Sequence, residues 1–399
     1  MQKRTETNIW LRRVVLMGYA MTLAGCLNSN GGGTVNSSSG ATVPSPSPSI
    51  NALSPSSIVS TIAGDPTRHT TVDGQGNAAG FVYAEGIAID VIGNLYVADS
   101  VGSVIRKITP TGNVTTIAGD GAIFQGQIDA AGTAARFAYP MGIAVDSSGN
   151  IFVSDDVTIR KITPTGVVTT FAGAYQQRGS NDGQGTAARF GSSNSPAHLT
   201  IDKQDNLYIA DGACIRKITS SALVSTIAGQ CGTQGNIDGN TLSARFNQLH
   251  GITIDTAGNL YASEIILKTI RKISSQGIVT TIAGAAGQSG STDGLGASAQ
   301  FTLPEGLAVD ALGNLLVADS TADTIRMITP AGQVSTIAGA ASPVFTPGTP
   351  NMTNKGNAGS VDGPGSNARF YFPISVVFDN NGNLYVVDRN NHTIRKISA

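Results

Sequence analysis

A set of short phrases that recurs six times constrains the fold of this chain more than any other feature of its sequence. Each unit contains a phrase close to G-N-L-Y-V-A-D, a phrase close to I-R-K-I and a phrase close to T-I-A-G. The acid that closes the first phrase stands at Asp99, Asp155, Asp211, Glu264, Asp319 and Asp388. These acids follow one another at spacings of 53 to 56 residues, apart from a last spacing of 69. A period of this size is typical of architectures built from stacked supersecondary units.

Each unit holds four short runs in which apolar residues alternate with small or polar ones. In the second unit these runs are Gly142–Val145, Ile151–Ser154, Thr158–Ile162 and Val167–Phe171. Turn-forming residues separate the runs, which is the pattern of antiparallel strands joined by hairpins. Four antiparallel strands in a repeat of this length are typical of a propeller blade.

The two ends of the repeated region supply complementary parts of one blade. The first run, Ile58–Ala63, is a fourth strand without the three that should precede it, and the last unit stops after its third strand, Ile394–Ile397. The N-terminal strand can therefore complete the last blade and cover two edges that would otherwise be unpaired. The sequence predicts an all-β, six-bladed β-propeller with four-stranded antiparallel blades, closed by the N-terminal strand.

The unit G-I-A-x-D-x-x-G-N-L-Y-V-A-D…I-R-K-I-T-P-x-G-x-V-T-T-I-A-G resembles the NHL repeat, in particular a bacterial type that ends in T-I-A-G. The resemblance covers residues 58–399 and implies the propeller fold. It implies much less about activity, because NHL propellers include RNA readers, protein-binding scaffolds and a few enzymes. The formal net charge is -1, and no run of basic residues follows the first thirteen positions. Nucleic-acid binding depends on a basic surface, so we expect no nucleic-acid partner.

The first 26 residues have the pattern of an export signal. Basic residues precede an apolar run, Val14–Leu23, which is too short to span a bilayer as a helix. The run ends in Leu23-Ala24-Gly25-Cys26, which resembles the bacterial lipobox and implies lipidation of Cys26. Residues 27–57 are rich in Gly, Ser, Thr, Asn and Pro and are predicted to form a disordered tether. The chain is thus expected in the bacterial cell envelope. Leu27, rather than aspartate, follows the cysteine, and for lipoproteins of enteric bacteria this implies sorting to the outer membrane.

The residue that precedes the G-I-A phrase is expected to line the axial channel, at the start of the innermost strand of each blade. These positions hold Glu85, Met141, Ala197, His250, Glu305 and Ile374. Three of them could bind a metal ion, and His198 lies one position later in the blade next to His250. Carboxylates and imidazoles bind Zn, Mn or Ca in different proportions. The alternative is that these are solvated polar residues in a wet channel.

The segment Leu249–Asp255 resembles the P-H-G-L-x-I-D run of zinc-dependent amidating lyases, which are also six-bladed propellers. In that family the histidine at the position of His250 is a metal ligand. The other histidines of the family have no counterpart here, so Glu85 and Glu305 would have to replace them.

The loops between units repeat a phrase close to D-G-x-G-x-x-A-R-F. Its acids are Asp73, Asp129, Asp182, Asp238, Asp293 and Asp362, and its aromatic residues are Phe81, Phe137, Phe190, Phe246, Phe301 and Phe370. The carboxylate alternation of a calcium-binding EF-hand loop is absent. We therefore expect the aspartate to cap a turn and the phenylalanine to fill the gap between neighbouring blades. The acids that close the second strand are expected to be structural as well.

Two departures from the repeat point to one face of the propeller. The second and third units have shortened connections, Asp155–Arg160 and Asp211–Arg216, which predicts a low point on the rim beside Asp156 and His198. An insertion from Ala340 to about Ser360 predicts a raised flap near the sixth blade. Together they would form a groove, although loops also tolerate such changes without function.

Cys214 opens a third strand and Cys231 follows the end of the next strand in the same unit. Antiparallel neighbours bring these ends together, and exported proteins form disulfides, so the two cysteines are expected to pair. No C-x-x-C, G-x-S-x-G, Walker or H-E-x-x-H motif is present.

The sequence favours a monomeric, membrane-anchored binding or scaffold protein that presents one propeller face to a protein or glycan. The alternative is a metal-dependent lyase or a lactonase-like hydrolase with a divalent ion at the channel mouth. Whether the chain is an enzyme stays open at this point, and the lack of a full catalytic set favours a binding role.

Overall fold

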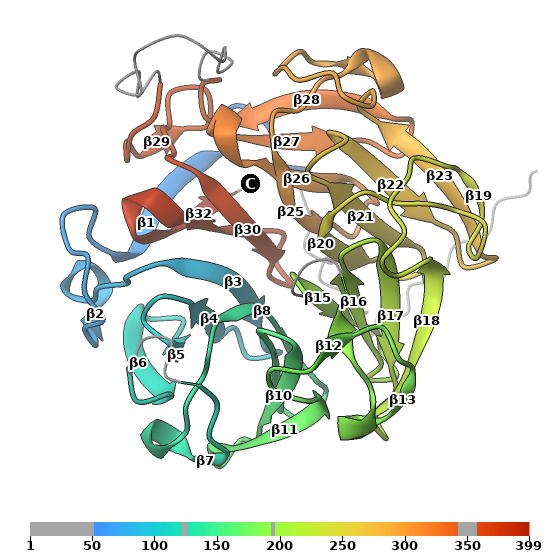
Figure 1. The fold of residues 1–399 in the computed structure, drawn as a ribbon. Coiled ribbons are helices and arrows are strands. Elements are labelled where there is room, and N and C mark those ends of the chain that lie inside the picture. The colour runs from blue at the N-terminus through green and yellow to red at the C-terminus, as the bar shows by residue number, and fades with distance from the viewer. Residues whose placement is uncertain (1–51, 122–125, 193–195, 342–356, 399) are drawn as a thin grey trace, which may run out of the picture. The chain divides into compact units, whose positions relative to one another are not determined.

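The computed structural model describes residues 52–121, 126–192, 196–341 and 357–398. In this part of the chain, six antiparallel sheets of five strands each are arranged as blades around a central axis (Figure 1). The predicted six-bladed β-propeller is confirmed. Cys26 and all but the last six residues of the predicted tether lie outside the described residues. Among the described residues, no helix is long and apolar enough to cross a membrane.

The blades share one strand order from the axis outward. The innermost strands are β3 Ala84–Ile89, β8 Pro140–Val145, β15 Leu199–Ile201, β20 Leu249–Ile254, β25 Pro304–Val309 and β30 Pro373–Phe378. The second strands are β4 Leu95–Asp99, β9 Ile151–Asp155, β16 Leu207–Asp211, β21 Leu260–Glu264, β26 Leu315–Asp319 and β31 Leu384–Asp388. The third strands are β5 Val104–Ile108, β10 Thr158–Ile162, β17 Cys214–Ile218, β22 Thr269–Ile273, β27 Thr324–Ile328 and β32 Thr393–Ser398. The fourth strands are β6 Asn113–Ala118, β11 Val167–Gly173, β18 Leu223–Gly229, β23 Ile278–Ala283, β28 Gln333–Ala338 and β1 Ile58–Gly64.

Each blade carries a fifth strand that the sequence did not reveal. These outermost strands have two residues each: β2 Gly74–Gln75, β7 Ala130–Ala131, β13 Gly183–Gln184, β19 Gly239–Asn240, β24 Gly294–Leu295 and β29 Gly363–Pro364. They come from the D-G-x-G loops and pair with the fourth strand of the same blade. Two residues are too few to show an alternating pattern, so only the pairing identifies them as strands.

The remaining elements are short and lie in the connections between the strands described above. Strands β12 Arg178–Gly179 and β14 Phe190–Gly191 pair in parallel. The 3-10 helices are η1 Gly76–Ala78, η2 Gly132–Ala134, η3 Gly185–Ala187, η4 Gly296–Ser298, η5 Ser320–Ala322 and η6 Arg389–Asn391. The last two matter for function, because each begins directly after the acid of a second strand.

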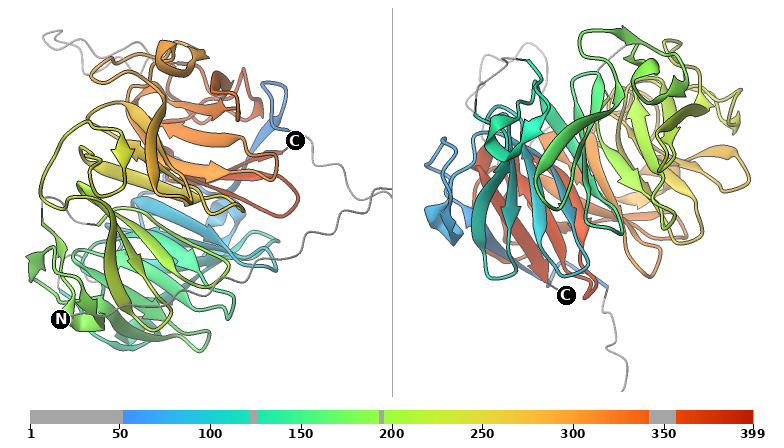
Figure 2. Two further views of the ribbon diagram at one scale, coloured as in Figure 1. Left: turned by 90° about the vertical axis from the view of Figure 1, so that its right-hand side faces the viewer. Right: turned by 90° about the horizontal axis from the view of Figure 1, so that it is seen from below.

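Closure of the ring follows the prediction. Strand β1 is antiparallel to β32, with Ile58 opposite Ser398 and Gly64 opposite Thr393. The N-terminal strand thus lies between the C-terminal strand and β29 in the sixth blade (Figure 1). The views in Figure 2 show the blue N-terminal strand beside the red C-terminal strands. Although the sequence predicts a tether that reaches residue 57, Leu53 is buried in the same cluster as Val59. Ordered packing therefore begins before the first strand.

The apolar core is divided into clusters between neighbouring blades. Phe81 is fully buried in a cluster that contains Val97 of the first blade and Ile394 of the sixth. The phenylalanines at the equivalent positions are also fully buried. The prediction that these rings fill the gaps between blades is confirmed, and it explains why the blades depend on one another.

A buried arginine links three parts of every blade. In the fourth blade the Arg271 guanidinium is 2.6 Å from Asp238, 3.0 Å from Glu264, and 5.0 Å from the centre of the Phe246 ring. Asp238 also accepts a hydrogen bond of 2.9 Å from the backbone of Thr281. The six arginines are Arg106, Arg160, Arg216, Arg271, Arg326 and Arg395, and all are fully buried.

This network corrects the expected role of the D-G-x-G aspartate. The residue does not cap a turn but joins the third and fourth strands through the arginine and a backbone amide. A fully buried guanidinium needs a counter-charge, which sequence reasoning about turns did not consider. The structural role of the acids at the ends of the second strands is confirmed by the same contacts.

The shortened connections of the second and third blades are two-residue turns, between β9 and β10 and between β16 and β17. Most of the insertion after Gly339 lies outside the described residues, so the predicted flap stays a prediction. Cys214 and Cys231 form the predicted disulfide, with their Cα atoms 4.8 Å apart.

Candidate functional site

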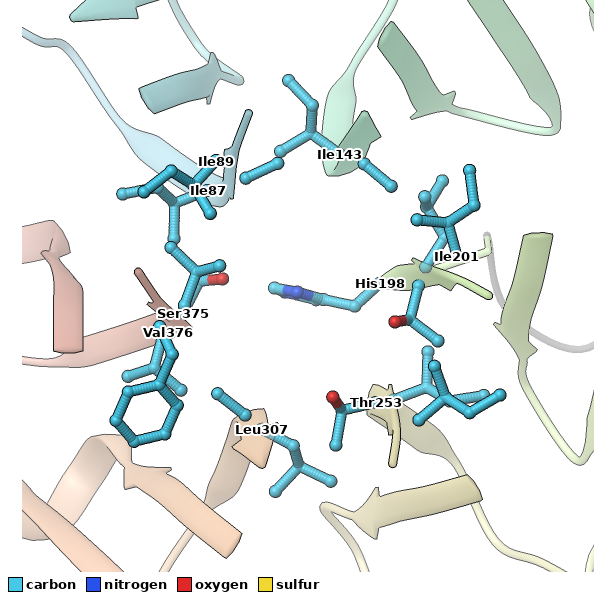
Figure 3. Close-up of a pocket in the computed structure, with 18 of the residues that line it drawn as sticks. Ile87, Ile89, Ile143, His198, Ile201, Thr253, Leu307, Ser375 and Val376 are labelled. Carbon is cyan, nitrogen blue, oxygen red and sulfur yellow. The ribbon is translucent and has the colours of Figure 1, made fainter. Parts of the chain in front are cut away.

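The six innermost strands surround a cavity of about 230 Å³ on the propeller axis (Figure 3). The innermost strands of neighbouring blades come closest at the first residue of the G-I-A phrase. Four of the six residues at this level are glycines: Gly86, Gly142, Gly251 and Gly306. A Cβ atom on Gly251, for example, would lie 1.9 Å from the carbonyl oxygen of Glu305 in the next blade. The other two residues at this level are His198 and Ser375, and both line the cavity.

One residue before this level, the predicted channel residues form a polar cluster that we call the channel mouth. It contains Glu85 of β3, His250 of β20 and Glu305 of β25, with Arg389 of η6. The Glu85 carboxylate accepts hydrogen bonds of 3.1 and 3.4 Å from Arg389 Nη1. Burial raises the pKa of Glu85 to about 7, against the opposing effect of Arg389.

Two aromatic rings hold the Arg389 side chain in place. Its guanidinium carbon is 4.4 Å from the centre of the Tyr83 ring and 4.2 Å from that of Phe372. Arg389 keeps 15% of its side-chain surface exposed, whereas Glu85 keeps 2%. The channel mouth therefore presents a cation that is fixed by two rings and a carboxylate and remains accessible.

Glu305 is held as a neutral acid. Ser320 Oγ is hydrogen-bonded to both Glu305 Oε2 and the carbonyl oxygen of Pro373. A hydroxyl has one hydrogen to donate and a carbonyl can only accept, so both bonds form together when Glu305 is protonated and donates to Ser320. Burial raises the pKa of Glu305 to about 8, which agrees with this assignment.

The two histidines lie side by side but leave ring nitrogens without protein partners. The centres of the His198 and His250 rings are 5.0 Å apart. His198 Nε2 and His250 Nδ1 are buried and have no hydrogen bond to any described residue. Burial lowers the pKa of His198 to about 4 and that of His250 well below its usual value, so both imidazoles are neutral at pH 7.

The arrangement brings the four predicted metal ligands into one region without forming a coordination sphere. His250 Nε2 is 3.9 Å from Glu305 Oε1, while Glu85 is paired with Arg389. Among the described residues, the one group of three or more ligand atoms within metal-binding distance is Asp211, Cys214 and Cys231, and its two cysteines form the disulfide. A divalent ion at the channel mouth would have to displace Arg389 and the Glu305 proton. The geometry thus fits a metal poorly.

Sequence reasoning missed Arg389, although a signal for it exists. The residue that follows the acid of each second strand is Ser100, Asp156, Gly212, Ile265, Ser320 and Arg389 in the six blades. Arg389 is the one basic residue in this set, and Ser320 is the partner of Glu305. A comparison of this position across the repeats would have identified both.

Comparison with known proteins supports the repeat and the fold. Residues 370–397 match the model of the NHL repeat, and residues 126–182 match that of the teneurin NHL domain. Human teneurin-4 is 31% identical over 232 residues, which are 49% of this chain and 8% of teneurin-4. Mouse teneurin-3 is 24% identical over 385 residues, which are 86% of this chain and 13% of teneurin-3. The chain thus spans a small fraction of the relatives that it matches.

Solved structures show the same architecture at low sequence identity. A Bacteroides thetaiotaomicron protein of unknown function has a TM-score of 0.64 and 20% identity, over 86% of this chain and 76% of its own. An auxiliary nutrient binding protein from the same organism has a TM-score of 0.62 and 17% identity, over 86% and 76%. A gluconolactonase from Xanthomonas campestris has a TM-score of 0.53 and 14% identity, over 87% and 91%. At these identities the likeness supports the fold alone. The chain therefore contains an NHL repeat at residues 370–397, and its described body is a six-bladed β-propeller.

Proposed function

We propose that this protein is a monomeric binding protein of the bacterial cell envelope, anchored through Cys26, and that the channel-mouth face of its propeller recognises a protein or glycan. The observation that carries the proposal is Arg389, fixed between Tyr83 and Phe372 and partly exposed near the axis. Arginine and tyrosine are enriched among the residues that dominate binding energy at interfaces. An aromatic ring beside a fixed cation also suits a sugar, which stacks on rings and offers hydroxyl groups.

The charge state of the channel mouth favours recognition over metal chemistry. Glu85 is neutralised by Arg389, and Glu305 by its own proton. The side chains are held by partners from their own or neighbouring blades, so the face is pre-organised for binding. The auxiliary nutrient binding protein of similar fold is consistent with such a role.

Glycan-array binding and envelope cross-linking with the full-length protein test this proposal. Arg389→Glu should abolish the glycan or partner signal, because it reverses the charge of the central side chain and breaks its pair with Glu85. Arg245→Glu is the matched control, since Arg245 lies in a loop before β20 and, among the described residues, its side chain bonds to the carbonyl oxygens of Leu242 and Ala244. A signal that survives in the Arg389 variant would mean that another surface binds. The absence of any specific signal would contradict a binding role.

The metal-dependent alternative has one observation in its favour, the approach of His250 Nε2 to Glu305 Oε1. It requires Glu305 to lose its proton and Glu85 to exchange Arg389 for the ion. We therefore place it second.

A further inference from the structure

The axial cavity lies beyond the channel mouth and has different chemistry. Most of its lining side chains are aliphatic, such as Ile87, Ile143 and Leu307, and the innermost strands, which are sheet edges, add backbone polar groups to its surface. No aspartate, glutamate, lysine or arginine is among its lining residues. An ion that entered would lose its hydration without compensation, so the cavity suits an uncharged occupant.

His198 directs an imidazole ring into this cavity. Figure 3 shows its ring extending from one wall toward the axis, with Ser375 on the wall across from it. His198 keeps 7% of its residue surface exposed, and its Nε2 has no protein partner among the described residues. Four of the six blades have glycine at this level, so a large side chain here is a departure from the repeat. A buried nitrogen without a partner costs stability unless a ligand or water satisfies it.

The size of the cavity limits the occupant. A cavity of about 150 Å³ lined by leucine, isoleucine and phenylalanine can hold benzene. The cavity here is about 230 Å³, which leaves room for one ring with a small substituent. Entry is open from the end opposite the channel mouth, because side chains there, such as Ile89, Ile201 and Phe378, are partly exposed.

We propose that the axial cavity binds one small, uncharged molecule with a hydrogen-bonding group, of the size and chemistry of a phenol, and that His198 Nε2 forms that hydrogen bond. This site is separate from the face proposed for partner recognition. A failure of either proposal leaves the other in place.

Fluorine NMR titrations of the full-length protein with 4-fluorophenol and with fluorobenzene, in buffer with EDTA, test the inference. Both probes should bind, and 4-fluorophenol should bind about fivefold to tenfold more tightly, as expected for one hydrogen bond. His198→Leu should remove this preference while fluorobenzene binding persists. Ser375→Leu should abolish binding of both probes, because the longer side chain enters the cavity.

The control is His69→Leu, which makes the same chemical change at an exposed residue of the rim and should alter neither affinity. Thermal denaturation confirms that each variant is folded. If the folded wild-type protein binds neither probe at millimolar concentration, the cavity holds water only and the inference is wrong. An undiminished preference for 4-fluorophenol in the His198 variant would also overturn it.

Discussion

At the scale of single residues, similar acids behave differently because their partners differ. Asp388 is fully buried beside Arg395, and its pKa is raised to about 6 by burial that the arginine only partly opposes. Glu305 has a hydroxyl as its partner, so burial raises its pKa further, to about 8. Asp388 is therefore ionised at neutral pH, whereas Glu305 is a neutral acid. The same residue class thus provides structural charge in one place and neutral hydrogen bonding in another.

The proton on Glu305 predicts a pH dependence of stability. The folded pKa of about 8 lies above the ordinary value of 4.5, so the folded state holds a proton that the unfolded state releases. This contribution is fully present below about pH 4.5 and is lost as the pH rises through 8. Glu305→Gln preserves a neutral hydrogen-bonding group for Ser320 and should flatten the fall of Tm between pH 5 and pH 8. If Tm falls with pH equally in the wild-type and variant proteins, Glu305 is ionised at neutral pH.

At the scale of elements, each blade is held by one buried arginine and each pair of blades by one buried phenylalanine. Arg326, for example, is fully buried and is 2.6 Å from Asp293, which lies in the loop before its own blade. Removing one partner of a buried ion pair typically costs about 3–5 kcal/mol, because the other charge is left uncompensated. Sixfold repetition of these contacts explains why the phrases I-R-K-I and D-G-x-G recur together.

The closing strand gives the prediction at this scale. Deletion of residues 58–64 removes β1 and exposes the edge of β32, which is otherwise paired along six positions. We expect the variant to be insoluble or unfolded by circular dichroism, since an unpaired edge and an open core promote aggregation. Deletion of seven residues at positions 36–42, within the predicted tether, is the control and should leave the melting temperature unchanged. Equal effects of the two deletions would contradict closure by β1.

At the scale of the whole molecule, the axis carries two chemically distinct regions. The channel mouth combines Glu85, Arg389, Glu305 and His250 from four blades, and the cavity beyond it has no acidic residue, lysine or arginine in its lining. Because no single blade contains either region, both depend on a closed ring. Loss of closure should therefore abolish partner recognition and small-molecule binding together.

Metal content is the measurement that separates binding from metal-dependent chemistry. We expect elemental analysis of the protein, purified without a metal-affinity tag, to find no stoichiometric zinc, calcium or manganese, because Arg389 occupies Glu85 and Glu305 carries a proton. The His250→Ala variant should then have the same metal content as the wild-type protein. About one equivalent of a divalent ion that disappears in this variant would instead support the lyase or hydrolase alternative.

Much of the fold could be predicted from local pattern. The four strands of the second unit were placed within two residues of β8–β11, because alternation and turn residues are local properties of the chain. The disulfide was predictable for the same reason, since a hairpin brings Cys214 and Cys231 together. The fifth strand of each blade was not predicted, because two residues are too few to show an alternating pattern and only their pairing identifies them as a strand.

For the candidate site, too, part could be predicted from the sequence and part required the tertiary structure. The sequence by itself pointed to the residue before G-I-A in each repeat, and so it identified Glu85, His250 and Glu305. Only the tertiary structure decided their chemistry. Arg389 reaches Glu85 from the neighbouring blade, and Ser320 reaches Glu305 from a 3-10 helix of the same blade. Burial at the axis sets which acid is charged and which histidine nitrogen is left without a partner. Charge and hydrogen bonding at this site depend on contacts between residues far apart in the chain, which a repeat pattern does not encode.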